Sequence, residues 1–444
     1  MPTSNTRPAK ITGKIDKPLP PIPQLNVREI LRDPLTFFPT LARQYGDVVG
    51  YRRTPEPAYL VNHPDYIRHI LMDNNRNYSK ETYINQMFKS VVADGLLTAE
   101  GGDWLQQRRL MQPAFHHKRI ASLDAVITGE VQKMLDRWKA YSDKREPLDI
   151  SREMAVLTLN ITTRALFGVD IGEDAGLVGD EVLITADLLE KPSNPRVQKA
   201  TRAVDKVVYG IIEERRRTRG DSGDLLSIMM EVRDQDTGLG MNDLELRNQV
   251  LTLLLAGYET TSSVLTWTWY LLSSHPQAVE RLRAETAKNI GERIPASQDL
   301  PKLQYARMVF EESMRLYPPA WILGRKALAE DEIGGFMIPA NAVIAISPYV
   351  VHRHPDFWEA AEVFDPERFS PERSVNRHRF AYIPFGAGPR QCIGNNLAML
   401  EAQLIITMVA RSYTMRLVPD QAIKPQAIFI LRPNRAILMQ LEEG

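Results

Sequence analysis

The stretch FGAGPRQCIGNN, residues 385–396, contains the only cysteine of a 444-residue chain. Its glycines and proline argue against a helix, whereas apolar residues recur at helical spacing in residues 395–412. Cys392 therefore comes directly before a predicted helix. At that place the positive end of the helix dipole and free backbone N–H groups favour a thiolate. We expect chemistry from this thiol, the alternative being a small buried apolar side chain.

The residues around Cys392 favour one kind of chemistry. Gly386, Gly388 and Gly394 let the backbone pass close to a flat or bulky group, and Arg390 adds positive charge. A thiolate in such a setting suits an axial ligand of haem iron. The pattern F-x-x-G-x-R-x-C-x-G resembles the haem-binding signature of the cytochrome P450 superfamily, with the matching residues Phe385, Gly388, Arg390, Cys392 and Gly394. The resemblance implies haem b, with Cys392 on the iron, Arg390 on a propionate and Gly388 as space for the ring.

Composition excludes several other classes of protein. Fifty-five basic and fifty-five acidic residues give a formal net charge of zero, so nothing indicates nucleic-acid binding. One cysteine cannot form an intramolecular disulfide, which suits a reducing compartment. The proline-rich residues 1–25 lack the apolar core of a signal peptide or membrane anchor. Residues 249–274 are apolar enough to resemble a membrane span, but Glu259 near their middle favours a helix buried in protein.

The chain reads as mainly α-helical with a minor β component. Helical periodicity dominates residues 26–45, 103–317 and 395–412. Residues 48–53 and 58–63 predict a hairpin, and residues 334–350, 413–418 and 435–441 predict further strands. This is not a βαβ alternation, so we expect no doubly wound sheet. After an extended lead-in over residues 1–25, residues 26–444 are expected to form one domain.

A second pattern lies in the long apolar helix. Ala256 and Thr260 are one turn apart and share a face, and Gly257 removes bulk beside them. A Thr hydroxyl bonded to the carbonyl one turn back leaves room for a small ligand, and the carboxylate of Glu259 can supply protons. The alternative is that Glu259 is a salt-bridged surface residue. The segment resembles the oxygen-activation motif of the family, which implies that Thr260 and Glu259 serve the oxygen chemistry.

A third pattern is a pair of opposite charges in a helix. Glu312 and Arg315 are three residues apart on one side, and an exposed pair at this spacing contributes little. Glu312 shares its face with apolar residues, so burial is expected, and a buried pair needs further partners. Arg368 resembles the third member of the Glu-Arg-Arg cluster of the family. We expect a structural role for all three.

The fourth pattern is Trp104 with Arg108, one turn apart. Both side chains could reach a haem propionate, the alternative being an exposed cation–π pair. Arg325 is a weaker candidate for the same contact. Arg108, Arg109, Lys118 and Arg119 form a basic cluster that could dock an acidic electron donor. His116, His117 and the stretch from His352 to His354 lack convincing metal-ligand spacing.

The resemblance extends over nearly the whole chain and implies a single triangular helical domain that performs monooxygenation with O2. No flavin, nicotinamide or iron–sulfur segment is visible, so electrons are expected from a separate ferredoxin or flavodoxin with its reductase. We expect a soluble, cytoplasmic bacterial enzyme, monomeric and without a membrane anchor. The substrate is expected to be lipophilic: a fatty acid, terpenoid, carotenoid or steroid. Pocket regions by resemblance are residues 79–97, 188–197 and 318–323, the last with Trp321, Ile322 and Leu323.

Three alternatives remain open at this point. A peroxide-driven peroxygenase would share the thiolate but would not need Glu259 and Thr260. A non-catalytic haem sensor would bind oxygen without turning over any substrate. A hydrolase would use Cys392 as nucleophile and His378 as base, and would contain no haem.

Overall fold

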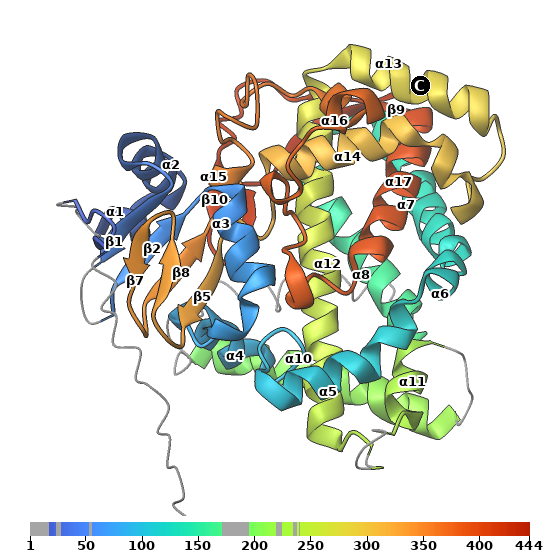
Figure 1. Ribbon diagram of the computed structural model, residues 1–444. Helices are drawn as coiled ribbons and strands as arrows, with labels where there is room; N and C mark the ends of the chain where they lie inside the picture. Colours follow the sequence, from blue (N-terminus) through green and yellow to red (C-terminus); the bar gives the residue numbers. More distant parts are fainter. Residues whose placement is uncertain are drawn as a thin grey trace, which may run out of the picture.

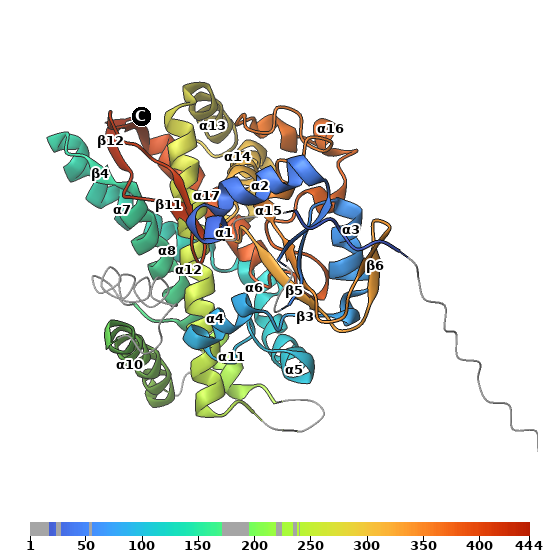
Figure 2. The same ribbon diagram turned by 90° about the vertical axis from the view of Figure 1, so that its left-hand side faces the viewer.

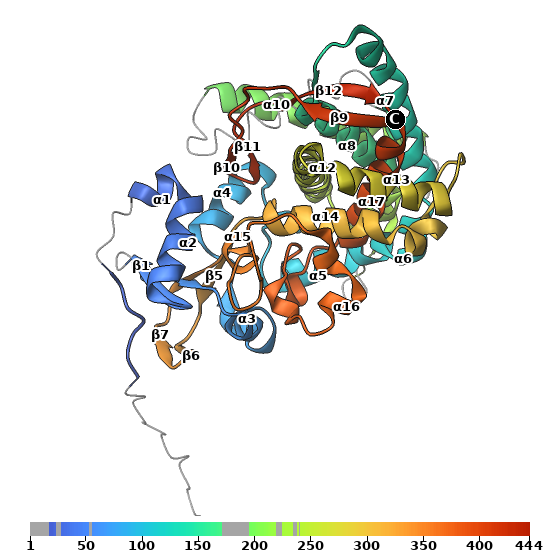
Figure 3. The same cartoon turned by 90° about the horizontal axis from the view of Figure 1, so that it is seen from above.

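The longest helix, α12 (Asp243–Ser273), runs through the middle of the molecule (Figure 1) and is seen end-on in Figure 3. The computed structural model describes residues 17–23, 28–52, 56–170, 195–218, 224–233, 238 and 240–444. Asn242 begins α12 with a capping box: its side chain accepts from the N–H of Glu245, whose carboxylate accepts from the N–H of Asn242. Most side chains of α12 are buried in protein, as expected. None of the described helices is long and apolar enough to cross a membrane.

Helices surround α12 on the side of the molecule away from the main sheet (Figures 1 and 3). The helix α8 packs along it, α7 and α17 pack against each other, and α14 contacts both α12 and α17. Apolar side chains from these helices form one continuous core. The other bounds are α1 (Arg28–Arg32), α2 (Pro34–Tyr45), α3 (Pro64–Arg68), α4 (Tyr83–Val92), α5 (Gly101–Met111), α6 (His117–Ala121), α7 (Asp124–Lys144), α8 (Ile150–Phe167), α10 (Pro195–Thr218), α11 (Leu225–Glu231), α13 (Pro276–Asn289), α14 (Gln304–Leu316), α15 (Pro348–Val351), α16 (Pro371–Ser374) and α17 (Asn395–Ser412).

The main sheet lies at the other side, next to α1, α2 and α3 (Figures 1 and 2), whereas β9 and β12 lie beside α7 (Figure 3). A five-stranded sheet has the order β1-β2-β8-β5-β3, and the three-stranded sheet β4-β12-β9 and two hairpins, β6-β7 and β10-β11, complete the β component. Their bounds are β1 (Val48–Arg52), β2 (Ala58–Val61), β3 (Tyr78–Ser79), β4 (Leu148–Asp149), β5 (Leu323–Ala327), β6 (Asp331–Ile333), β7 (Phe336–Ile338), β8 (Val343–Ile346), β9 (Tyr413–Leu417), β10 (Pro425–Ala427), β11 (Leu431–Pro433) and β12 (Leu438–Glu443).

The expected fold class is confirmed: a helical body with a small β region and no βαβ alternation. The predicted hairpin is β1-β2, and the helix predicted for residues 395–412 has those bounds in α17.

Two element predictions were wrong in detail. The helix expected over residues 26–45 is divided at Asp33, because Pro34 restricts the residue before it and begins α2. The strand expected through residue 350 ends at Ile346, because Ser347 caps a short helix with Pro348 at its first position.

Part of the proline-rich lead-in lies against the main sheet and the β6-β7 hairpin. The N–H of Gly50 in β1 donates to Pro21 O at 2.8 Å, and the N–H of Met337 in β7 donates to Pro18 O at 3.0 Å. Residues 1–16 and 24–25 of the lead-in lie outside the described residues.

Candidate active site

Cys392 lies in the turn between the short 3-10 helix η8 (Gly388–Arg390) and α17. Its backbone N–H donates to Phe385 O at 2.9 Å, which closes the glycine-rich stretch into a loop. Its side chain is exposed to solvent and forms no disulfide. The loop therefore presents the thiol at the beginning of a helix, as the sequence predicts.

The protonation state expected from the helix terminus differs from what the surroundings dictate. The Cys392 side chain is exposed at the surface of the loop, yet the surrounding protein partly desolvates it. This desolvation raises the pKa of the Cys392 thiol. The N–H groups of Gly394 and Asn395 and the charge of Arg108 act in the opposite direction, with the smaller effect. The protein alone thus favours the neutral thiol, and a metal ion is needed to hold it as thiolate.

Gly388 is required by packing between two short elements. Its φ is +70°, and a Cβ at this residue would lie 1.8 Å from the carbonyl oxygen of Leu71. Leu71 belongs to the π-helix η1 (His69–Asp73), which contacts η8. The missing side chain of Gly388 thus faces η1, so the expectation that this glycine makes space for a ring needs this correction.

The middle of α12 has an open stretch. Residues 246–255 are all buried, whereas Ala256 is exposed and Gly257 and Thr260 are half-buried. The hydroxyl of Thr260 donates to Ala256 O at 2.8 Å, and the Glu259 side chain is buried at 4% exposure. The surface alternative for Glu259 was therefore wrong. Within the buried middle of α12, the opening at Ala256, Gly257 and Thr260 can receive a ligand without unfolding the helix.

Gly257 serves the packing of α12 on α8. A Cβ at Gly257 would lie 3.0 Å from Cγ2 of Thr162 in α8. Thr158, one turn earlier in α8, donates its hydroxyl to Tyr258 O at 3.0 Å. The bulk that Gly257 removes is thus at the contact between the two helices, and not on the face of Ala256 and Thr260 as the sequence suggested.

Glu312, Arg315 and Arg368 lie together, fully or almost fully buried. Arg315 donates from Nε and Nη2 to the two carboxylate oxygens of Glu312, at 2.6 and 2.7 Å. Arg368 Nε is 3.4 Å from Oε1 of Glu312, and its other nitrogens donate to backbone carbonyls. The remaining Arg315 donors bind the carbonyls of His352, Ala361 and Val363. The cluster thereby fastens α14 to the segment 352–368.

The candidate propionate residues occupy two places. The guanidinium of Arg390 lies 4.0 Å above the ring of Trp104 and donates to Glu100 at 2.8 Å. Arg108 points elsewhere, since its Nη1 donates to Gln391 O at 3.0 Å and its charge acts on Cys392. The cation–π partner of Trp104 is therefore Arg390, and the alternative of an exposed cation–π pair between Trp104 and Arg108 was wrong.

Lys80 is a candidate site residue that no sequence pattern indicated. It follows β3, is half-buried, and donates from Nζ to Leu97 O. Burial, together with the charges of Arg325 and Arg390, lowers its pKa to about 7. Burial and the charge of Arg390 likewise lower the pKa of Arg325 to about 10. No local sequence signal distinguishes this lysine, because only the sheet register places it beside Arg325.

The three predicted pocket residues differ in their surroundings. Trp321 packs near Phe38 of α2, with ring centroids 6.4 Å apart, and its indole N–H donates to Ile428 O at 3.2 Å. It belongs to the core rather than to an open pocket. Ile322 and Leu323 are half-buried. Of the other expected pocket segments, residues 188–194 lie outside the described residues.

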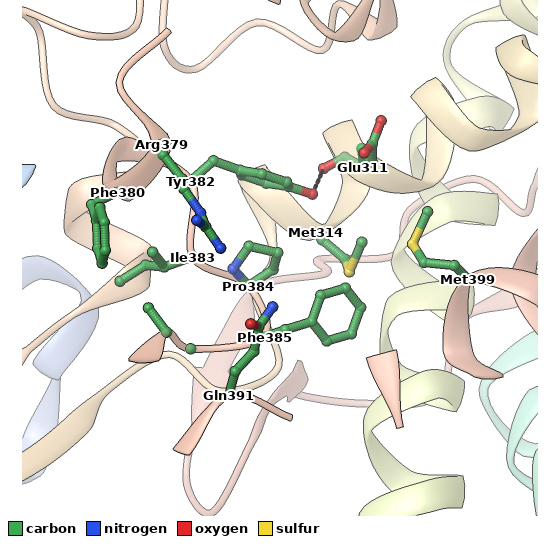
Figure 4. A pocket seen from close by; sticks show the side chains of 12 residues that line it. Glu311, Met314, Arg379, Phe380, Tyr382, Ile383, Pro384, Phe385, Gln391 and Met399 are labelled. Carbon is green, nitrogen blue, oxygen red and sulfur yellow. Dashed lines mark hydrogen bonds between the residues drawn. The ribbon is translucent and has the colours of Figure 1, made fainter. Parts of the chain in front are cut away.

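A cavity of about 220 Å³ lies beside the cysteine loop (Figure 4). Its walls are the segment 379–387, Gln391 and the side chains of Met314 and Met399, and the hydroxyl of Tyr382 donates to Glu311 O at 2.8 Å. None of its lining residues comes from α12. It is thus separate from the open stretch at Ala256 and Thr260.

The geometry contradicts the hydrolase alternative. Both ring nitrogens of His378 are engaged: Nε2 lies 3.1 Å from Oδ1 of Asp65, and Nδ1 accepts from the N–H of Phe380 at 3.1 Å. A general base must be within hydrogen-bond reach of the proton that it removes. His378 therefore has other partners than Cys392.

Comparisons with known proteins agree along the whole chain. The family model described as Cytochrome P450 matches residues 20–178 and 180–441. Cyclooctatin synthase of Streptomyces melanosporofaciens is 38% identical over 411 residues, covering 89% of this chain and 88% of that protein. Cyclooctat-9-en-7-ol 5-monooxygenase of the same organism is 36% identical, with coverages of 87% and 86%. Pentalenene oxygenase of Streptomyces avermitilis is 30% identical, with coverages of 93% and 94%.

A solved structure shows the same fold. The haem domain of cytochrome P450DA superposes with a TM-score of 0.87 at 23% identity, covering 96% of this chain and 97% of that chain.

Proposed function

Because the chain belongs to the cytochrome P450 family of haem monooxygenases, we propose that it inserts one oxygen atom of O2 into a cyclic terpenoid, with Cys392 as the iron ligand. The observation that carries the proposal is the exposed thiol at the start of α17, within the haem-binding pattern of residues 385–394. The relatives support the substrate class, since two of them are named for the oxygenation of cyclooctat-9-en-7-ol and of pentalenene.

The described residues fit haem b. Cys392 offers one exposed sulfur ligand at the start of α17, and an iron bound there would take its other ligands from porphyrin nitrogens. Arg390 and Arg325 carry positive charge suited to the propionates. When bound, haem supplies the activation of oxygen, and the thiolate donates electron density to it.

The protein's own groups manage protons near the open stretch of α12. The Thr260 hydroxyl donates its hydrogen bond to Ala256 O, so its oxygen can accept a hydrogen bond from a neighbouring group. Glu259, the residue before it, is a carboxyl group within a mostly apolar helix and can deliver protons by general acid catalysis. We assign Thr260 to positioning the proton donor and Glu259 to the proton supply.

The surroundings of the open stretch suit an apolar substrate. Phe88 of α4 and Phe429, between β10 and β11, bring their ring centroids to 4.0 Å. Both elements contact α12: α4 packs against it, a Cβ on Gly95 beyond the end of α4 would collide with Thr252, and Ser263 donates to Leu431 O of β11 at 2.6 Å. The two rings therefore join two elements that lie beside α12. A cyclic hydrocarbon would find aromatic contact there.

An external electron donor is part of the proposal. Arg109 and Lys118 are exposed, and Arg108 of the same basic cluster binds the Gln391 carbonyl next to the cysteine. A positive surface beside Cys392 suits an acidic ferredoxin or flavodoxin. We further propose that the enzyme is monomeric and that residues 26–444 form its haem domain. A cytoplasmic location is part of the proposal, because a single cysteine suits a reducing compartment.

Two spectroscopic experiments test the assignment. Titration of the purified holoenzyme with cyclic terpenes, fatty acids, carotenoids and steroids should shift the iron spin state most strongly with the terpenes. A stronger response to fatty acids would overturn the substrate class. Cys392→Ser should lose the thiolate signature of the reduced carbon monoxide complex, and no other cysteine can replace it. Retention of that signature would refute the ligand assignment.

A further inference from the structure

Two easily oxidised side chains stack where α12 meets the end of α14. Trp267 of α12 is buried at 1% exposure, and Tyr317 is the residue directly after α14. Their ring centroids are 3.9 Å apart, and the ring planes lie within 5° of parallel. Aromatic pairs more often adopt offset or edge-to-face arrangements, so these two rings overlap unusually closely. Indole and phenol are among the side chains that lose one electron most readily, and such overlap allows fast electron exchange between them.

The stack begins on the face of α12 that carries the open stretch. Trp267 follows Thr260 by seven residues, so the two side chains leave the helix in nearly the same direction, about 10 Å apart along its axis. Tyr317 is half-buried and continues the stack toward solvent. The pair thus connects the face of α12 that we assign to oxygen chemistry with the surface of the molecule.

The indole N–H of Trp267 is buried and has no hydrogen-bond acceptor among the described residues. Buried polar groups are nearly always paired, so this exception needs a reason. An indole that has lost one electron is a strong acid, and with no acceptor beside it the proton stays in place. The oxidised Trp267 therefore remains charged and strongly oxidising, and it can take an electron from the ring stacked on it.

We propose that Trp267 and Tyr317 form a one-electron relay that discharges the oxidised haem when no substrate is bound. This inference rests on the proposed function. One electron passes from Trp267 to the oxidised haem, and one passes from Tyr317 to Trp267. The phenolic proton of Tyr317 leaves to water, and an external one-electron donor such as ascorbate restores Tyr317 with one electron and one proton. Two such transfers, with two protons from water, return the haem to its resting state and leave its oxygen atom as water.

The surroundings of Tyr317 suit the last step of the relay. Burial, together with the neighbouring Tyr270 and Tyr349, raises the pKa of Tyr317 to about 12, so the phenol keeps its proton until it is oxidised. The guanidinium of Arg353 lies 3.9 Å from the ring centroid of Tyr349. A cation over a ring is attracted to its electrons and makes their loss harder, so we place the end of the relay at Tyr317 and not at Tyr349.

Detection of radicals tests the relay without relying on turnover. Substrate-free holoprotein that is mixed with a peracid and frozen within milliseconds should show a tyrosyl radical by electron paramagnetic resonance. Tyr317→Phe keeps the stacked ring but removes the phenol, so the tyrosyl signal should be lost and a tryptophan radical should take its place. Trp267→Phe keeps an aromatic ring on α12 and should strongly weaken the tyrosyl signal, because the first carrier is missing.

Trp269→Phe is the matched control. Trp269 lies on the same helix, is buried at 2% exposure and has an indole N–H without an acceptor, but none of the ring pairs among the described residues includes it. This variant should give the wild-type spectrum. Peptide mass analysis after exposure to peroxide is the second readout, and Tyr317→Phe should carry more added oxygen on Trp267 than wild type does.

The outcomes separate the relay from simple packing. An unchanged tyrosyl signal in Tyr317→Phe, with wild-type oxidation of Trp267, would show that the stack only packs α12 against α14. Tyr317→Phe decides alone if Trp267→Phe does not fold. A protein that takes up no haem would overturn the proposed function and the relay together. A haem-loaded protein that hydroxylates its substrate but forms no radical at Tyr317 would overturn the relay alone.

Discussion

At the scale of single residues, the proposed role of the Thr260 hydroxyl can be tested directly by substitution. It is half-buried on the open stretch of α12, and its hydroxyl is held by the carbonyl of Ala256. Thr260→Ala should therefore fold normally but lower the amount of product formed per O2 consumed by about tenfold or more, with peroxide released instead. Oxygen uptake and product measured in one reaction check this.

Thr260→Ser is the matched control, because it keeps the hydroxyl, and it should retain most of the coupling. Wild-type coupling in Thr260→Ala, together with equal turnover on added peroxide, would favour the peroxygenase alternative.

The sequence predicted this residue because a helical period of 3.6 residues fixes which side chains share a face. The same reasoning could not tell where the missing side chains of Gly257 and Gly388 point. Those directions depend on Thr162 and on the Leu71 carbonyl, which come from distant segments. Lys80 was missed for a related reason, since its neighbour Arg325 is set by strand pairing across the chain.

At the scale of elements, α4 and the β10–β11 turn meet through one aromatic pair beside α12. The rings of Phe88 and Phe429 meet at 4.0 Å although they are far apart in the sequence. Phe429→Ala should widen this region, so that a bound cyclic terpene turns more freely and gives a broader mixture of products. The binding free energy should weaken by about 1–2 kcal/mol, as for the loss of an aromatic contact. Product analysis by gas chromatography and a spin-state titration measure both effects.

Tyr83→Ala is the control on the same helix, because Tyr83 is 68% exposed. It should change neither the product mixture nor the affinity. An unchanged mixture in both Phe429→Ala and Phe88→Ala would exclude this pair from the substrate site.

The long helices could be predicted from the periodicity of their apolar residues, and the ends of several elements depend on capping residues and prolines. The beginning of α17 was predictable because the glycine-rich loop before it disfavours an α-helix and contains only the short 3-10 helix η8. The errors at α2 and α15 both involve a proline at the first helical position, where its fixed φ is compatible with a helix. A proline thus ended one predicted strand and divided one predicted helix for the same physical reason.

At the scale of the whole molecule, a buried polar frame joins α14 to the cysteine loop. Glu312 and Arg315 were predictable as a pair from their spacing, but the carbonyls of His352, Ala361 and Val363 that complete the cluster were not. These acceptors lie in irregular segments whose course no periodic pattern reports. His352 extends the frame, because its Nε2 accepts from the N–H of Ile383 at 2.9 Å, just before the loop that bears Cys392.

The same histidine makes the stability of the molecule depend on pH. Complete burial and the charge of Arg315 lower the pKa of His352 from 6.5 to about 3. Below pH 6.5 the unfolded chain binds a proton that the folded protein does not, so stability falls as the pH decreases from 6.5 toward 3. At pH 5 this single group should cost about 2 kcal/mol of unfolding free energy.

His352→Gln retains an acceptor for Ile383 and does not titrate, so its loss of stability between pH 7 and 5 should be smaller than that of wild type by this amount. Urea unfolding of the holoenzyme at both pH values measures the difference, with the exposed His117→Gln as control, and equal losses in wild type and His352→Gln would contradict the assignment.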